Sequence, residues 1–129
     1  MATVKLIDEM EASAGVEKIY SEIKQAFGVP FVPNLFKAMA HHPAYLETSW
    51  GRVRAIMGPG KLDRRTKEII ALAVSATNNC TYCIDAHTAQ LRKLGLGDAE
   101  ITEVMAVVDL FNGFNKLADG MQLESDLKP

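Results

Sequence analysis

Two cysteines, a histidine and a glutamate are the residues of this sequence best suited to chemistry. Cys80 and Cys83 are its two cysteines, and they form a C-x-x-C motif with His87 four residues after the second. Helical positions three or four residues apart share a face, so both thiols and the imidazole are expected on one stripe. Glu68 lies upstream and is a candidate partner of the imidazole. A thiol pair beside an imidazole can carry out redox chemistry.

The spacing of the cysteines is compatible with a reversible disulfide. Helical geometry separates Cα atoms three residues apart by roughly 5 Å, within the usual disulfide range of about 4.4 to 6.8 Å. We expect Asn78 or Asn79 to cap the helix, which places Cys80 in its first turn, where the helix dipole favours a thiolate. Cysteines of such motifs have pKa values lowered from about 8.5 to roughly 3.5–7.5. Either cysteine can be the nucleophile on this reasoning, because the cap favours Cys80 and the nearby His87 favours Cys83.

The elements that must position these residues are two helices joined by a tight turn. Apolar periodicity predicts helices over residues 63–78 and 80–94, with Asn78 and Asn79 at the turn that joins them. In an antiparallel hairpin, residues equally far from the turn lie at the same depth. We therefore expect Glu68 and His87 to lie level with each other and to face each other.

The rest of the chain is also helical in pattern, and the fold is predicted to be all-α with about six helices around the central hairpin. Asn34 and Asp98 are expected N-caps of later helices. The further helices are expected at residues 13–27, 34–40, 43–57 and 98–121. No segment alternates as a strand does, so the C-x-x-C motif cannot belong to a thioredoxin fold.

Length and composition limit the class of protein. The 129 residues predict a single domain, 1–129, with loosely ordered tails at 1–12 and 122–129. A net charge of −2 gives no basic surface for nucleic acid. No window is apolar enough to span a membrane, and the N-terminus does not resemble a signal peptide, so we expect a cytoplasmic protein.

Other interpretations of the same residues exist. The cysteines can be a buried structural pair, or they can contribute to a zinc site, which needs four ligands. Glu68 can be an ordinary solvated glutamate of a helix edge. The last predicted helix is apolar around more than one face, so either the core wraps it or it packs against a second subunit, and we favour a homo-oligomer. At Gly113 within it we expect either close packing of another helix or a kink.

The arrangement of Glu68, eleven residues, Cys80-Thr-Tyr-Cys83, three residues and His87 resembles the alkyl hydroperoxidase D-like branch of the carboxymuconolactone decarboxylase family. The resemblance extends through VPFVPNLFKAMAHHP, KLDRRTKEIIALAVSATNNC and AHTAQLRKLGLGDAEI, and covers residues 30 to 121. It implies an all-α fold that assembles as trimers or as hexamers, with the site near a subunit interface. It also implies hydroperoxide reduction by a cysteine pair, with no bound cofactor and with an external dithiol of the lipoyl or thioredoxin type as reductant.

The resemblance also implies a role for each residue. Cys83 is similar to the peroxidatic cysteine and Cys80 to the resolving one, while His87 takes the thiol proton and Glu68 holds the imidazole. One departure is Tyr82, which stands where the best-characterised branch has a second histidine. A slower peroxidase or a different substrate is therefore a further expectation. The alternatives are a dithiol–disulfide oxidoreductase or redox sensor that acts on a protein partner, and a metal-binding or structural helical oligomer.

Overall fold

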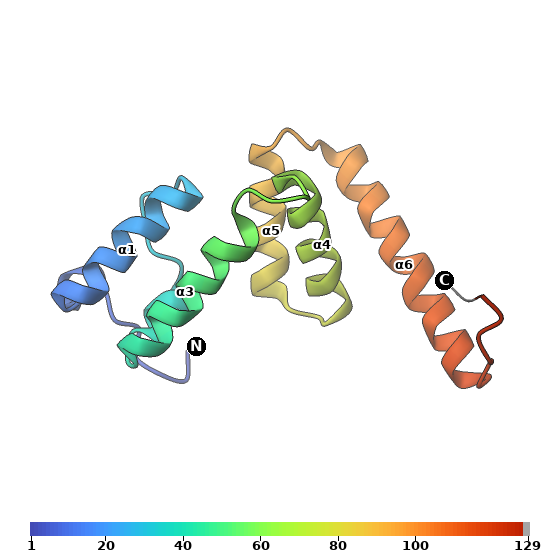
Figure 1. Ribbon diagram of the computed structural model, residues 1–129, viewed down its shortest axis with the longest axis horizontal. Helices are drawn as coiled ribbons and strands as arrows, with labels where there is room; N and C mark the ends of the chain where they lie inside the picture. Colours follow the sequence, from blue (N-terminus) through green and yellow to red (C-terminus); the bar gives the residue numbers. More distant parts are fainter. Residues whose placement is uncertain (128–129) are drawn as a thin grey trace. The chain divides into compact units, whose positions relative to one another are not determined.

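The computed structural model describes residues 1–127, and every regular element among them is helical (Figure 1). A short 3₁₀ helix, η1, spans Glu9–Glu11. Six α-helices follow: α1 Ala14–Phe27, α2 Asn34–Met39, α3 Pro43–Met57, α4 Arg64–Thr77, α5 Thr81–Lys93 and α6 Asp98–Gly120. The predicted all-α fold of about six helices is confirmed.

The described chain divides into two compact units, Met1–Gly60 and a second that begins at Lys61. The single domain expected from the length stays a prediction, as does the loose order of the two tails. Residues 128 and 129 of the second tail lie outside the described part. No helix in residues 1–127 has the length and apolar character needed to cross a membrane.

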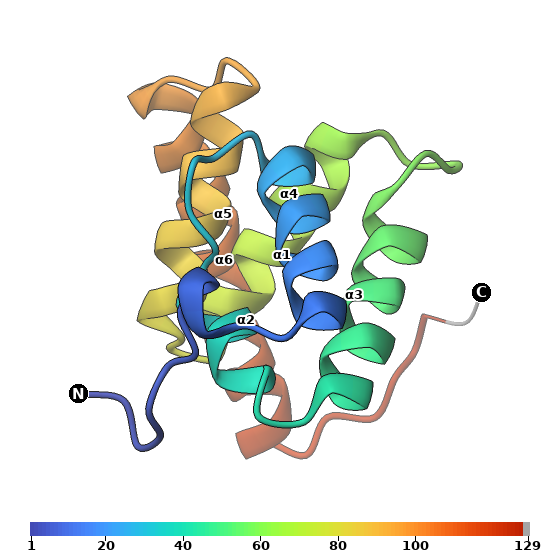
Figure 2. The same ribbon diagram turned by 90° about the vertical axis from the view of Figure 1, so that its left-hand side faces the viewer.

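The first unit is built from α1, α2 and α3, with α3 packed against both of the others (Figure 2). Ser13 caps α1, and Gly28 ends it in the left-handed conformation that glycine adopts without strain. The Tyr20 hydroxyl donates to the Ile7 carbonyl oxygen at 2.8 Å and ties the N-terminal segment to α1. The buried core consists of Val16, Tyr20, Ile23, Val32, Phe36, Ala40, Leu46 and Trp50.

The second unit contains the predicted hairpin, formed by α4 and α5, and α6 packs against α4. Its buried core is small and consists of Leu72, Leu91 and Leu96, with apolar residues of α4, α5 and α6 around them. The turn of the hairpin passes through Asn79, whose φ of 55° is left-handed. Asparagine tolerates this conformation better than most residues with a side chain, which explains why the turn lies at the asparagines.

Three expected N-caps differ from the structure. Pro33, not Asn34, precedes α2, and Gly97, not Asp98, precedes α6, where the Glu100 carboxylate accepts a hydrogen bond from the Gly97 N–H. Cys80 itself, and neither asparagine, caps α5. Each shift is one or two residues, because several polar or flexible residues lie side by side at these boundaries and only the backbone conformation selects among them.

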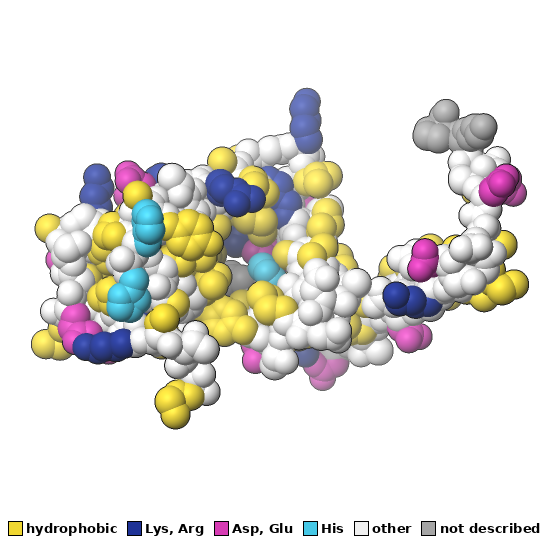
Figure 3. All heavy atoms as spheres, turned by 90° about the horizontal axis from the view of Figure 1, so that it is seen from below, with side chains coloured by type: hydrophobic (Ala, Val, Ile, Leu, Met, Phe, Trp, Pro, Cys, Tyr) yellow, Lys and Arg dark blue, Asp and Glu magenta, His cyan; other side chains and the backbone are white. Residues whose placement is uncertain are grey.

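Helix α6 leaves most of its apolar surface uncovered. All of Asp98–Gly120 is described, and none of its residues is buried. Hydrophobic side chains are visible along it in Figure 3. The large exposed ones are Val107, Leu110, Phe111, Phe114 and Leu117, followed by Met121 and Leu123 beyond the helix. Apart from the backbone of α6 itself, no described atom beyond the adjacent residues lies within 4 Å of a Cβ built on Gly113, so no described residue packs closely there.

Candidate active site

Glu68 and His87 meet across the hairpin, as their distances from the turn predict. Glu68 comes from α4 and His87 from α5, and Oε2 of the carboxylate lies 2.7 Å from Nδ1 of the imidazole. Glu68 is 1% exposed, whereas His87 is partly exposed. The alternative of a solvated glutamate is therefore wrong, because the carboxylate is enclosed by the two helices and its hydrogen-bond partners.

Arg64 is a third member of this cluster that the sequence analysis did not identify. Its Nε donates to Oε1 of Glu68 at 2.8 Å, and its Nη2 lies 2.7 Å from the same oxygen. The two residues are four apart on α4, the spacing at which helical side chains are neighbours. This spacing of four residues was the feature of the sequence that could have predicted the contact between Arg64 and Glu68. The carboxylate thus uses one oxygen for Arg64 and the other for His87.

The environment of Glu68 keeps it ionised. Burial alone would raise its pKa, because a desolvated carboxylate loses the stabilisation of water. The hydrogen bonds from His87 and Arg64, together with the charge of Arg64, outweigh burial and lower the pKa of Glu68 below its ordinary value of 4.5. An ionised carboxylate only accepts hydrogen bonds. Nδ1 of His87 must therefore carry the proton, and in the neutral imidazole Nε2 is then the basic nitrogen.

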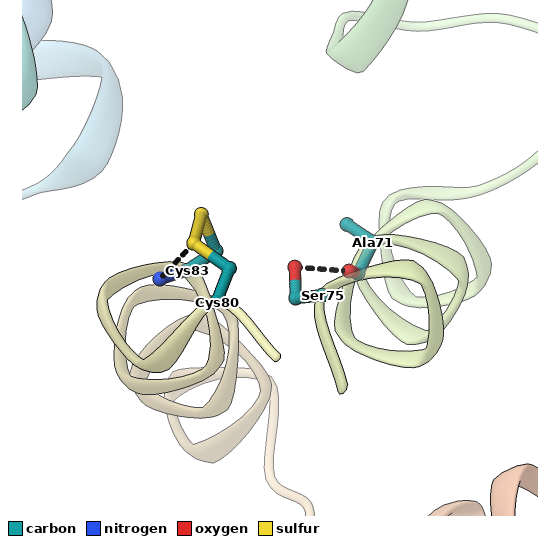
Figure 4. Close-up of a disulfide and its surroundings, with 4 residues drawn as sticks. All are labelled: Ala71, Ser75, Cys80 and Cys83. Carbon is teal, nitrogen blue, oxygen red and sulfur yellow. Dashed lines mark hydrogen bonds between the residues drawn. A yellow bond between two sulfur atoms is a disulfide. The ribbon is translucent and has the colours of Figure 1, made fainter. Parts of the chain in front are cut away.

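The two cysteines lie at the start of α5 and are joined as a disulfide with a Cα–Cα distance of 5.3 Å (Figure 4). The predicted compatibility of the motif with a disulfide is confirmed. The Cys83 N–H donates to Cys80 Sγ at 3.3 Å. The Cys80 N–H donates to the Ser75 carbonyl oxygen at 3.0 Å. Cys80 is thus fixed at the junction of the two helices, and its sulfur occupies the position where an N-cap side chain accepts backbone hydrogen bonds.

Ser75 is the residue of α4 that lies nearest the turn among its buried side chains. It is 7% exposed, and its hydroxyl donates to the Ala71 carbonyl oxygen at 2.6 Å. Figure 4 shows Ser75 on α4 and the disulfide at the start of α5. Since the hydroxyl is already bonded within its own helix, we assign it no chemical role.

Cys83 and His87 are linked through their spacing on α5. They are four residues apart on one continuous helix, so their side chains emerge from the same face one turn apart. Both are only partly buried. The hairpin therefore carries a disulfide at its turn and, one helical turn further along α5 on the same face, an imidazole. This imidazole is bonded to a buried carboxylate that a partly exposed arginine also contacts.

A metal site is the alternative chemistry for such residues. Within residues 1–127, no group of three or more histidine, cysteine, aspartate or glutamate side chains is arranged to hold a metal ion. Asp85, an acid two residues after Cys83, is exposed.

Comparison with known proteins places the chain in a family. The sequence profile of the carboxymuconolactone decarboxylase family matches residues 41–123, more than half of the chain. The chain belongs to this family. The match includes Glu68, both cysteines and His87, so the candidate site lies inside the shared region.

A solved structure superimposes on almost the whole chain. It is the crystal structure of the alkylhydroperoxidase AhpD core from Rhodospirillum rubrum, with a TM-score of 0.91 and 39% sequence identity. The match covers 98% of this chain and 95% of that one. The all-α family fold expected from the resemblance is confirmed.

More distant relatives carry names that point to more than one reaction. An alkyl hydroperoxide reductase AhpD of Coxiella burnetii is 29% identical and covers 89% of this chain and 67% of its own length. An alkyl hydroperoxide reductase of Mycobacterium tuberculosis is 31% identical over 67% of this chain, and an (R)-2-haloacid dehalogenase of Pseudomonas putida is 27% identical over 82%. This chain spans only 25% and 35% of the length of the last two. Family membership therefore does not select the reaction, and the residues of the site must do so.

Proposed function

We propose that the chain is a thiol-dependent hydroperoxide reductase that uses the Cys80–Cys83 pair. The observation that carries the proposal is the disulfide at the start of α5, on the same helix as a histidine held by a buried carboxylate. A thiol pair explains reduction of an oxidant, and the Glu68–His87 pair supplies the proton transfers that peroxide cleavage needs. The AhpD-named relatives support the same class of reaction.

The cycle begins with the reduced thiols. His87 accepts the proton of the Cys83 thiol at Nε2, and the thiolate attacks one oxygen of the hydroperoxide O–O bond. The bond breaks, Cys83 becomes a sulfenic acid, and the departing alkoxide takes the proton back from His87 and leaves as an alcohol. The sulfur has lost two electrons and the peroxide has gained them. Glu68 stabilises the positive charge that His87 carries between the two proton transfers.

The second half of the cycle restores the thiols. The Cys80 sulfur attacks the Cys83 sulfenic acid, water leaves, and the disulfide forms. An external dithiol, of the lipoyl or thioredoxin type, then reduces the disulfide by thiol–disulfide exchange and is itself oxidised. The cycle needs no bound cofactor. Partial exposure of both cysteines gives such a reductant access to the disulfide.

The experiment that tests this function is steady-state consumption of an alkyl hydroperoxide with dihydrolipoamide as donor. The wild-type chain is expected to turn over, and Cys83→Ser to lose activity to the background rate. Full activity of Cys83→Ser would reject the assignment. Mass spectrometry after mild peroxide treatment separates both redox functions from a metal-binding or structural protein, because a redox pair loses two hydrogens and both free thiols, whereas a metal site retains zinc. Disulfide formation without peroxide turnover would favour a dithiol oxidoreductase or redox sensor that acts on a protein.

We also propose that the protein is a homo-oligomer, a trimer or a hexamer, that covers the apolar surface of α6. Exposed side chains of this size and number are unusual on a monomer surface and mark interaction sites. A groove of about 350 Å³ between α4 and α6 continues this apolar surface, with Val104, Val107 and Val108 in its wall. A second copy of the chain would bury both the groove and the phenylalanines beyond it.

A further inference from the structure

The first turn of α4 carries positive charge where helix electrostatics disfavour it. Arg64 is the first residue of the helix. The first turn itself contains no acid, and the acidic N-cap, Asp63, accepts from the Thr66 N–H. The N-terminal end of a helix bears a partial positive charge, so a cation there is unfavourable. The position of Arg64 is explained instead by its contact with Glu68, which both Nε and Nη2 make on the same carboxylate oxygen.

We propose that Arg64 is a positioning residue of the candidate active site, one that keeps Glu68 ionised and directs its second oxygen to Nδ1 of His87. This inference rests on the proposed function and adds a supporting residue to its Glu68–His87 pair. Arg64 acts through Glu68 and His87. It does not itself take part in peroxide cleavage.

A buried carboxyl without a neighbouring cation favours its protonated form. Glu68 is almost fully buried. A protonated carboxyl has an O–H that can donate to Nδ1, which moves the imidazole proton to Nε2. His87 would then have no basic nitrogen for the Cys83 thiol. Arg64 prevents this because its guanidinium is charged at every relevant pH and occupies only Oε1.

The same contact also fixes the direction of the carboxylate. Nε and Nη2 of Arg64 both contact Oε1, which leaves Oε2 for Nδ1 of His87 at 2.7 Å. The charged groups that contact Glu68 within the described chain are Arg64 of α4 and His87 of α5. Arg65, the next residue, has the same charge but lines the groove between α4 and α6, away from the Glu68–His87 contact. The structure gives it no hydrogen bond or salt bridge to Glu68 among the described residues, and its variant is compared with the wild type at the same oligomer mass. Arg65 therefore provides a matched control.

The test compares Arg64→Gln, Arg64→Lys and Arg65→Gln in the full-length chain. The first readout is the ¹⁵N spectrum of the His87 ring in the reduced protein, which distinguishes a proton on Nδ1 from one on Nε2 and needs no substrate. Wild type and Arg65→Gln are expected to show the Nδ1–H form. Arg64→Gln is expected to gain the Nε2–H form, and Arg64→Lys, which keeps the charge and loses the second donor, to lie between them.

The second readout is the pH profile of peroxide consumption. General-base catalysis contributes about 10²- to 10⁴-fold, so a partial loss of the basic tautomer in Arg64→Gln should lower the rate near neutral pH by about tenfold or more. The acid limb of its profile should move to higher pH, because Glu68 then binds a proton more readily. Arg65→Gln should keep the wild-type profile.

The outcomes separate the inference from the proposed function. A folded Arg64→Gln that keeps the wild-type His87 tautomer and pH profile overturns the role of Arg64. Should Arg64→Gln fail to fold, Arg64→Met decides, since an unchanged ring spectrum and profile in that variant, which also lacks the charge, overturn the role as well. Absence of peroxide turnover in the wild type rejects the proposed function, while the ring spectra still report on Arg64.

Discussion

The replacement of Glu68 by glutamine is the sharpest test of how the hairpin works. Glutamine has nearly the same shape, and its side-chain oxygen can still accept from Arg64, as Oε1 of Glu68 does at 2.8 Å. Its NH₂ group would then face Nδ1 of His87 in place of Oε2. An NH₂ group donates, so the imidazole must present a lone pair at Nδ1 and carry its proton at Nε2. Glu68→Gln therefore exchanges the tautomer while leaving the backbone and the cysteines in place.

The size of the effect follows from the contacts that change. Without a basic Nε2, the general-base contribution of His87 is lost, which lowers the rate of peroxide consumption by about 10²- to 10⁴-fold. An acid-to-amide exchange at the orienting carboxylate of a serine protease triad lowers kcat by about 10⁴ for the same reason. Stability changes less. Hydrogen bonds to charged groups contribute about 1.5–3 kcal/mol each, and glutamine keeps weaker versions of them, so we expect about 1–2 kcal/mol of destabilisation.

The assay must separate loss of catalysis from loss of the thiols. Single-turnover oxidation of the reduced chain by an alkyl hydroperoxide, followed by intact mass, measures disulfide formation without the external dithiol. Glu68→Gln should form the same Cys80–Cys83 disulfide, but more slowly by the factor given above. Its ring ¹⁵N spectrum should show the Nε2–H form of His87. A variant that oxidises at the wild-type rate with the exchanged tautomer would refute the reasoning, because the basic nitrogen would then be unnecessary.

Three further predictions test other parts of the molecule. Cys80→Ser should still consume one equivalent of peroxide, stop at the Cys83 sulfenic acid and give a dimedone adduct, whereas a lack of adduct would assign the attack to Cys80. Urea unfolding should show that the wild type has a higher free energy of unfolding than Glu68→Gln, by an amount that is constant above about pH 4.5, the ordinary pKa of the carboxyl. This difference should shrink as the pH falls through the lowered pKa of folded Glu68, and a difference that grows in acid would contradict the assigned shift. Phe114→Glu should reduce the oligomer mass measured by light scattering, while Lys116→Glu on the same helix should not, and equal masses for both would remove α6 from the interface.

The helices could be predicted from the sequence because their boundaries have local causes. Asp63 accepts a hydrogen bond from the Thr66 N–H at 2.7 Å, and Gly28 ends α1 with a positive φ. Both are strong local signals. Cys80 as the cap of α5 was not predictable in this way, since a thiol is not among the preferred capping groups. Its selection depends on the left-handed Asn79 before it and on the Ser75 carbonyl that receives its N–H.

The candidate site was predictable in part. Counting residues from the turn is enough to bring Glu68 level with His87, because an antiparallel pair of helices has a fixed rise per residue. The burial of Glu68 was not predictable, because Ile69 and Ile70 beside it are compatible with either a buried or an exposed glutamate. Ile70 is in fact exposed, and Glu68 is turned inward. Arg64 was within reach through its spacing of four residues, but a basic residue at a helix N-terminus usually faces solvent.

The depth of each group in the hairpin matches what the proposed cycle demands of it. An external dithiol must reach the disulfide in every turnover, so the sulfurs cannot be fully enclosed, and both cysteines are partly exposed at the start of α5. The proton acceptor has the opposite requirement, because its tautomer must already be correct before the peroxide arrives. The tautomer of His87 is fixed one helical turn further from the hairpin turn, where Glu68 is 1% exposed and contacts His87 of α5. A carboxylate at such depth stays ionised only beside a cation, and Arg64 supplies it from the edge of α4, where its own side chain is still 36% exposed. The disulfide must be accessible to the dithiol, whereas the carboxylate that orients His87 must be enclosed. The helical hairpin meets both requirements because it places the cysteines and Glu68 at different distances from its turn.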